Sequence, residues 1–137
     1  MRTAVRALFA RMVSPAPPSR ADAGRLPGPD EALAQLNRAA GQLPVTVALD
    51  WPADGPPRVQ MAAANAGAGP AALLTSALAR DAIAFLADPD SRLLAACSAP
   101  RCVRYFLREH GRQEYCKPSC SNRARAARHY QRRNSAT

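Results

Sequence analysis

The chain has 137 residues and carries 19 Lys and Arg against 10 Asp and Glu, a net charge of +9. That length fits one domain, or one small domain with an appendage, and excludes a large two-domain enzyme. Alanine accounts for 31 residues, whereas Leu, Ile, Val and Phe together number only 23. A low share of large apolar residues together with a high net charge is close to the composition of disordered chains. We therefore expect a thin core that needs a metal, a partner or another chain.

The charge and the cysteines are concentrated in the last third of the chain. Residues 1–96 have a net charge of +1, from 9 Arg and 8 acidic residues, whereas residues 97–137 have a net charge of +8, from 10 basic and 2 acidic residues. All four cysteines lie in the second segment. Such a segment indicates a polyanionic partner, most often nucleic acid and less often an anionic membrane. We expect no membrane partner, because no run of 18 or more apolar residues is seen, and no export, because Arg6 and Arg11 interrupt any secretory signal.

The first residues predict two helices joined by a linker. Apolar side chains at helical spacing predict an amphipathic helix over residues 1–13, with an organellar presequence as the alternative. Residues 14–29 are rich in Pro, Gly, Ser and Ala, which is typical of a linker. A helix should follow over 30–41, because the Asp30 carboxylate can cap its first turn.

A hairpin and a long helix are predicted next. Residues 45–49 alternate apolar side chains, a Pro- and Gly-rich turn follows, and residues 58–62 are a return strand. The strongest helical periodicity covers 71–87, after Pro70. Asp90 or Ser91 is placed to cap a short helix after it. The predicted core face of the long helix consists of Leu74, Leu78, Ala82 and Phe85.

The cysteines form two close pairs, Cys97 with Cys102 and Cys116 with Cys120, separated by thirteen residues. Two such pairs are the sequence form of a tetrahedral zinc site, and four thiolates leave no open coordination position. The sequence therefore predicts one structural Zn²⁺. The alternatives are disulfide bonds and an iron–sulfur cluster. Disulfide bonds are disfavoured because the sequence shows no secretory signal.

Between the pairs, residues 103–107 alternate as in a short strand, and the chain should turn at Gly111. Phe106 and Tyr115 are predicted to cover the metal. Two histidines could also act as ligands, but their contexts favour solvated or phosphate-facing roles; these are His110 and His129.

Residues 121–133 predict a basic helix that contains five arginines and no acidic residue. Like charges at this spacing destabilise an isolated helix, and DNA phosphates would offset the repulsion. The alternative is a solvated Arg-rich face that follows from codon usage. Ala126 and Tyr130 are predicted to rest on the finger. The predicted nucleic-acid contacts are Lys117, Arg123, Arg125, Arg128, Arg132 and Arg133.

The cysteine spacing, Tyr105-Phe106, Tyr115-Cys116 and the run from Cys120 through Ser121-Asn122-Arg123 into an Arg-rich helix together resemble the CGNR zinc-finger family. These bacterial proteins carry the finger behind a domain known as ABATE and are regarded as stress-induced transcription regulators whose finger binds DNA. The resemblance implies that Cys97, Cys102, Cys116 and Cys120 hold the metal, that Asn122 is a structural motif position and that Arg123 contacts phosphate.

The resemblance also suggests a domain division. Residues 1–96 are expected to be an ABATE-like domain shortened at its N-terminus, 97–133 the finger with its basic helix, and 134–137 a disordered tail. Ser121 replaces the glycine of the family motif, and Tyr115 stands where tryptophan is usual.

The expected fold class is α+β: a mainly helical body with a small β-hairpin, then a zinc finger and a basic C-terminal helix. We expect a zinc-containing transcription regulator of the bacterial cytoplasm, associated with the nucleoid, that binds duplex DNA. The alternative is a zinc-stabilised module that docks RNA or an acidic protein. No Ser/His/Asp set or phosphate loop suggests an enzyme. Residues 1–96 should bind a small-molecule or protein ligand, or form a homodimer.

Overall fold

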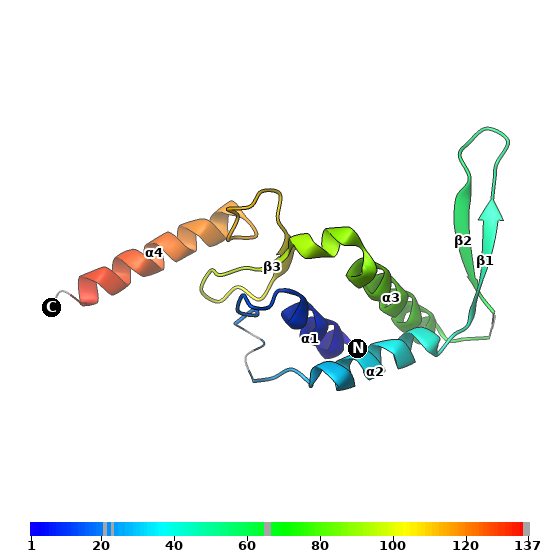
Figure 1. Ribbon diagram of the computed structural model, residues 1–137, viewed down its shortest axis with the longest axis horizontal. Helices are drawn as coiled ribbons and strands as arrows, with labels where there is room; N and C mark the ends of the chain where they lie inside the picture. Colours follow the sequence, from blue (N-terminus) through cyan, green and yellow to red (C-terminus); the bar gives the residue numbers. More distant parts are fainter. Residues whose placement is uncertain (21, 23, 65–66, 136–137) are drawn as a thin grey trace.

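The computed structural model describes residues 1–20, 22, 24–64 and 67–135. Within these residues the fold is α+β, as predicted, with four α-helices, a 3-10 helix and two two-stranded antiparallel sheets. A β-hairpin projects from one end of the molecule, and the C-terminal helix extends from the other (Figure 1). Three helices between these ends form the body.

This helical body consists of α1 (Arg2–Met12), α2 (Pro29–Gly41) and α3 (Pro70–Ala87), with α2 packed against both other helices. Proline begins α2 and α3, where its missing N–H costs nothing. Asp30 makes no capping hydrogen bond, because α2 starts before it, with Gly28 at the N-cap. The core is built from small side chains and two leucines, which allows close helix packing: Ala4, Ala7, Leu8, Ala32, Leu36, Ala39 and Ala79.

The predicted core face of α3 is wrong over the first half of the helix. Leu74 is 61% exposed and Leu78 46% exposed, whereas Ser76 and Ala79 are buried. The reason lies at the end of α2, where carbonyl groups lack helical partners. Ser76 Oγ donates to the Ala40 carbonyl oxygen at 2.9 Å, so the polar side of α3 turns toward α2.

Arg80 completes the same contact. Its Nη1 atom donates to the carbonyl oxygens of Ala40 and Leu43, both at 3.2 Å, and to Ser76 Oγ at 2.8 Å. A cation at the C-terminal end of a helix also interacts favourably with the helix dipole. The polar groups at the end of α2 therefore decide which side of α3 faces inward.

By length and composition alone, α3 is long and apolar enough to cross a membrane, which differs from the expectation from sequence. Such evidence from a single helix is weak. Arg80 and Asp81 lie in the middle of α3, and Arg80 is engaged by the end of α2. These contacts favour the interpretation of α3 as a helix of the body.

The predicted hairpin is confirmed. Strand β1 (Val45–Asp50) pairs antiparallel with β2 (Arg58–Ala63), and the Ala64 N–H donates to the Pro44 carbonyl oxygen at 2.8 Å to close the hairpin base. Within the described residues, no third strand joins this sheet.

The segment predicted as a linker is partly built into the fold. Ser19 is 1% exposed and Asp22 5% exposed, although residues 21 and 23 lie outside the described residues. Arg6 of α1 donates to both carboxylate oxygens of Asp22, at 2.7 and 2.9 Å. The pairing of Arg6 with Asp22, sixteen residues apart, is what holds this segment against α1.

A short 3-10 helix (Pro89–Leu93) leads from α3 into the finger. Asp88 caps it, in place of the predicted Asp90 or Ser91, by accepting a hydrogen bond from the Asp90 N–H at 2.8 Å. Strand β3 (Leu94–Ala96) then pairs antiparallel with β4 (Tyr105–Leu107). The finger sheet therefore begins three residues before the predicted boundary at 96/97. The sequence predicted a turn at Gly111, but among the described residues no strand after Gly111 pairs with β4.

The last element is α4 (Pro118–Asn134), which starts three residues earlier than predicted. Lys117, in an extended conformation, precedes the helix, and Pro118 occupies its first position. Of the predicted disordered tail, Asn134 is helical and Ser135 bonds back to the Gln131 carbonyl oxygen, whereas residues 136–137 lie outside the described residues.

Candidate metal centre

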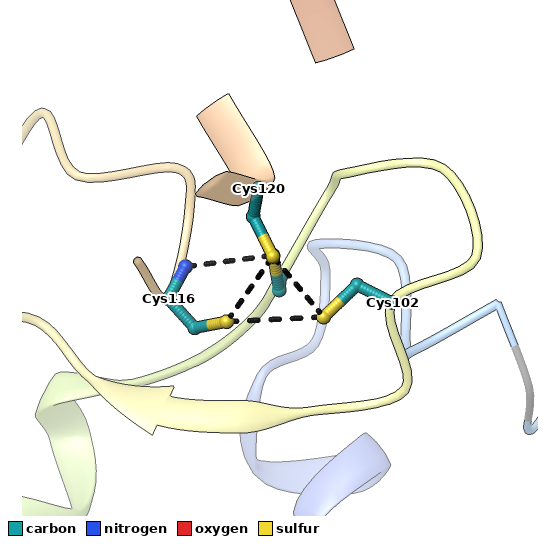
Figure 2. A group of neighbouring side chains, drawn as sticks. Cys102, Cys116 and Cys120 are labelled. Atoms are coloured by element: carbon teal, nitrogen blue, oxygen red, sulfur yellow. Dashed lines mark hydrogen bonds between the residues drawn. The ribbon is translucent and has the colours of Figure 1, made fainter. Parts of the chain in front are cut away.

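Four segments of the finger bring the cysteines together. Cys97 directly follows β3, Cys102 and Cys116 lie in the loops on either side of β4, and Cys120 lies in the first turn of α4. Figure 2 shows the sulfur atoms of Cys102, Cys116 and Cys120 directed toward one another. Three of the four residues are buried, and Cys116 is partly exposed.

The distances between the sulfur atoms fit one tetrahedral ion. Cys116 Sγ lies 3.8 Å from Cys102 Sγ and 3.7 Å from Cys120 Sγ, and the last two are 3.8 Å apart. With Zn–S bonds of about 2.3 Å, a tetrahedral site places its sulfur atoms about 3.8 Å apart. Cys97 completes the group, because all four sulfur atoms lie within 4.8 Å of one another.

The alternatives from sequence fit this geometry less well. All four cysteines are free, and the sulfur atoms are much farther apart than the roughly 2.05 Å of a disulfide bond. An iron–sulfur cluster would spread its cysteines around several iron atoms, whereas these sulfur atoms converge on one position.

Burial opposes the ionisation of the clustered thiols. Burial, reinforced by the thiols of Cys120 and Cys97, raises the pKa of Cys116 to about 12, and burial also raises the pKa of Cys120. Burial opposes ionisation of Cys102 too, but hydrogen bonds to the Arg104 backbone and to the neighbouring thiols lower its pKa to about 7. Four thiolates therefore need a cation, and Zn²⁺ binding would drive their deprotonation.

A compact shell holds the ligands in place. Phe106 and Tyr115 pack against the cysteines, which confirms their predicted covering role. The Cys116 N–H donates to Cys97 Sγ at 3.4 Å. In the turn before Cys102, Arg101 adopts a φ of 59°, a left-handed conformation that costs a non-glycine residue about 1 kcal/mol.

Helix α4 is fixed to the metal centre through its first turns. Cys120 and Ala124 are its buried residues. Ala126 and Tyr130, which were predicted to rest on the finger, are exposed, and Tyr130 is 68% exposed. The early start of the helix is the reason, because Cys120 becomes the inward residue and Ala124 follows it at i+4. Ser121 lies within the helix without a positive φ, so this position does not require glycine.

Two residues of the predicted DNA-contact and motif set are exposed but make hydrogen bonds within the finger. Arg123 donates from Nη1 to the Pro100 carbonyl oxygen at 3.2 Å and from Nη2 to Cys120 Sγ at 3.7 Å. It thus connects α4 to the turn that carries Cys102. Asn122 Oδ1 accepts a hydrogen bond from Arg125 Nη2 at 2.7 Å, which is a local contact within the helix.

The other predicted contacts lie on the surface. Arg125 and Arg128 are exposed, and Arg128 Nη1 donates to the Tyr115 hydroxyl oxygen at 3.4 Å. The remaining basic residues of the set are also exposed: Lys117, Arg132 and Arg133. His110 and His129 are exposed and lie outside the cysteine group.

The structure reveals one contact between the body and the finger that the sequence did not predict. The Tyr105 hydroxyl of β4 donates to Asp22 Oδ2 at 2.8 Å, and the Arg6 guanidinium carbon lies 5.3 Å from the centre of the Tyr105 ring. Arg6 Nη2 also donates to the Val103 carbonyl oxygen at 2.8 Å. Phe9 extends the contact, with its ring 5.5 Å from that of Tyr105. We call these residues, Arg6, Phe9, Asp22, Val103 and Tyr105, the junction.

A closed four-cysteine centre at the base of a basic helix defines a zinc finger, and residues 93–133 match the family described as CGNR zinc finger. Residues 1–89 match the ABATE family, described as "Putative stress-induced transcription regulator". This second match covers well over half of the chain, so the protein belongs to the ABATE family, with one structural zinc site in its finger. No curated protein matches the chain.

Proposed function

We propose that the protein binds duplex DNA through α4 and acts as a zinc-dependent transcription regulator. The observation that carries the proposal is the anchoring of an acid-free, Arg-rich helix on the metal centre by Cys120 and Ala124. The zinc ion would fix the start of α4, and the helix would present its arginines to phosphate. Cytoplasmic, nucleoid-associated localisation in a bacterium belongs to the same proposal.

Charge supports this proposal. The segment 97–137 has a net charge of +8, and four thiolates with one Zn²⁺ add a charge of −2 to it. About +6 therefore remains for the attraction of phosphates at neutral pH. Arg123 donates to Cys120 Sγ and Pro100, so its guanidinium contributes to the architecture of the finger. The best candidates for phosphate contacts are Lys117, Arg125, Arg128 and Arg132.

A regulatory role without catalysis belongs to the same proposal. His110 and His129 both lie on the surface, and the metal is enclosed by four thiolates, which leave no position for a substrate. We further propose that the ABATE body senses a small-molecule or protein ligand, since the junction connects it directly to the finger.

Salt-dependent DNA binding tests the proposal. Neutralising four phosphates predicts that affinity falls by about 100-fold between 50 and 200 mM salt, because counterions are released. The double substitution Arg125→Ala with Arg128→Ala should weaken binding and reduce the slope of log K against log salt by about 2. Fluorescence anisotropy with a labelled duplex and the zinc-loaded full chain measures both quantities.

The matched control is Arg2→Ala with Arg38→Ala, which removes the same charge from exposed positions on α1 and α2. This control should leave the salt slope unchanged. An equal loss of DNA affinity in both variants would show that only the net charge of the protein matters. Binding to RNA but not to duplex DNA, or affinity independent of salt, would favour the alternative of a zinc-stabilised docking module.

A further inference from the structure

The hairpin presents an entirely apolar face to solvent. Its register pairs Val45 with Ala63, Val47 with Met61 and Leu49 with Val59 on that face, and the polar pairs lie on the other face. Exposure is 69% for Val47, 66% for Leu49, 70% for Val59 and 58% for Met61. An isolated two-stranded hairpin is at best marginally stable in water. This face therefore needs a cover.

More exposed apolar side chains lie beside the hairpin in the chain. Trp51, directly after β1, is 69% exposed, and three leucines at the start of α3 are exposed as well, namely Leu73, Leu74 and Leu78. Alanines fill the core of the body, whereas these larger side chains lie outside it. The thin core expected from composition thus arises because much of the large apolar surface is directed away from the body.

We propose that this hairpin face, together with Trp51 directly after β1, is the interface of a homodimer. The area supports a second copy as the partner. At roughly 100 Å² for each of the exposed side chains Val47, Leu49, Val59 and Met61, and about 200 Å² for tryptophan, the surface comes to about 600 Å². Two such surfaces would bury about 1,200 Å², the area at which specific interfaces begin.

The chemistry of the surface also favours self-association. Its hairpin face carries no charged side chain, so a two-fold axis would place apolar side chains against one another without like-charge contacts. Among the residues that the structure describes, no further strand pairs with either edge of the hairpin, so a second hairpin could pair there. The hairpin and α4 lie at opposite ends of the molecule, so the dimer leaves both basic helices free (Figure 1).

The test replaces one cross-strand pair on each face of the hairpin. Leu49→Lys with Val59→Glu introduces an ion pair on the apolar face without changing net charge. Ala48→Lys with Gln60→Glu introduces the same pair on the opposite face, and opposite charges at such positions preserve strand pairing. Sedimentation equilibrium of each zinc-loaded full chain measures the dissociation constant.

The wild type and the Ala48/Gln60 variant should be dimers at about 10 µM, and the Leu49/Val59 variant should dissociate more readily by at least about 100-fold. Helical circular dichroism and one zinc per chain show that each variant has folded. A monomeric wild type, or equal dissociation of both variants, would overturn the proposal. A monomer that cosediments with phosphatidylglycerol vesicles would assign the face to a membrane instead. This measurement does not involve DNA, so its result is independent of whether α4 binds DNA.

Discussion

The helical body and the zinc finger are stabilised by different forces. The body buries alanines and two leucines between three helices, whereas the buried cluster of the finger consists of three cysteines and Ala99. In the finger the bond energy of the metal takes the place of hydrophobic burial, which is how a segment with so few apolar residues can hold a fixed fold. The two regions should therefore respond to different perturbations.

Removal of zinc should have the largest effect. Structural zinc contributes on the order of 10 kcal/mol to the folding of a small finger, so a strong chelator should unfold residues 97–120 and loosen the start of α4. The body has its own core and should largely survive. Hydrogen exchange read by mass spectrometry resolves the two regions, with α3 as the internal control. Protection of the finger that persists after complete metal removal would contradict this view.

A cavity in the body should have the opposite regional effect. Leu36 is 1% exposed at the centre of the body core, and Leu36→Ala should destabilise the body by about 4 kcal/mol. Zinc content should stay at one per chain. Chemical denaturation followed by far-ultraviolet circular dichroism measures the loss. Leu33→Ala is the control, because Leu33 lies on the same helix but is 45% exposed, and it should cost far less.

The junction should couple the two regions. Asp22→Ala leaves the partly buried Arg6 without its carboxylate partner, and loss of one member of a buried pair costs about 3 kcal/mol. It also removes the acceptor of the Tyr105 hydroxyl, so body and finger should unfold in separate transitions. Calorimetry of the zinc-loaded chain shows whether one transition becomes two. A single, equally cooperative transition would show that the junction does not couple them.

Tyr105→Phe should have the smallest effect, about 1 kcal/mol, because it removes one hydrogen bond and keeps the ring contacts with Phe9. Burial and the bond to Asp22 raise the pKa of Tyr105 to about 12. The unfolded chain ionises first, near pH 10, so the contribution of this hydroxyl is complete below pH 10 and is lost as the pH rises toward 12. The wild type should lose stability over that range more steeply than the Tyr105→Phe variant.

Local sequence patterns determined most of the secondary structure and the metal ligands. The hairpin and α3 match their predicted ranges within one or two residues, because strand alternation, helical periodicity and proline act over a few residues. The cysteine spacing alone identified the four ligands. The start of α4 was missed, because Lys117-Pro118 begins a helix that already contains Cys120.

Contacts between distant segments depended on the tertiary structure. Periodicity assigned Leu74 and Leu78 to the core, but Ser76 faces inward because the end of α2 needs hydrogen-bond donors. Arg123 is engaged by Pro100, twenty-three residues away, and Tyr105 by Asp22, eighty-three residues away. Sequence patterns record which side chains are apolar, charged or able to bind metal. Only the packing of helices decides which backbone groups lack partners, and thus which polar side chains turn inward.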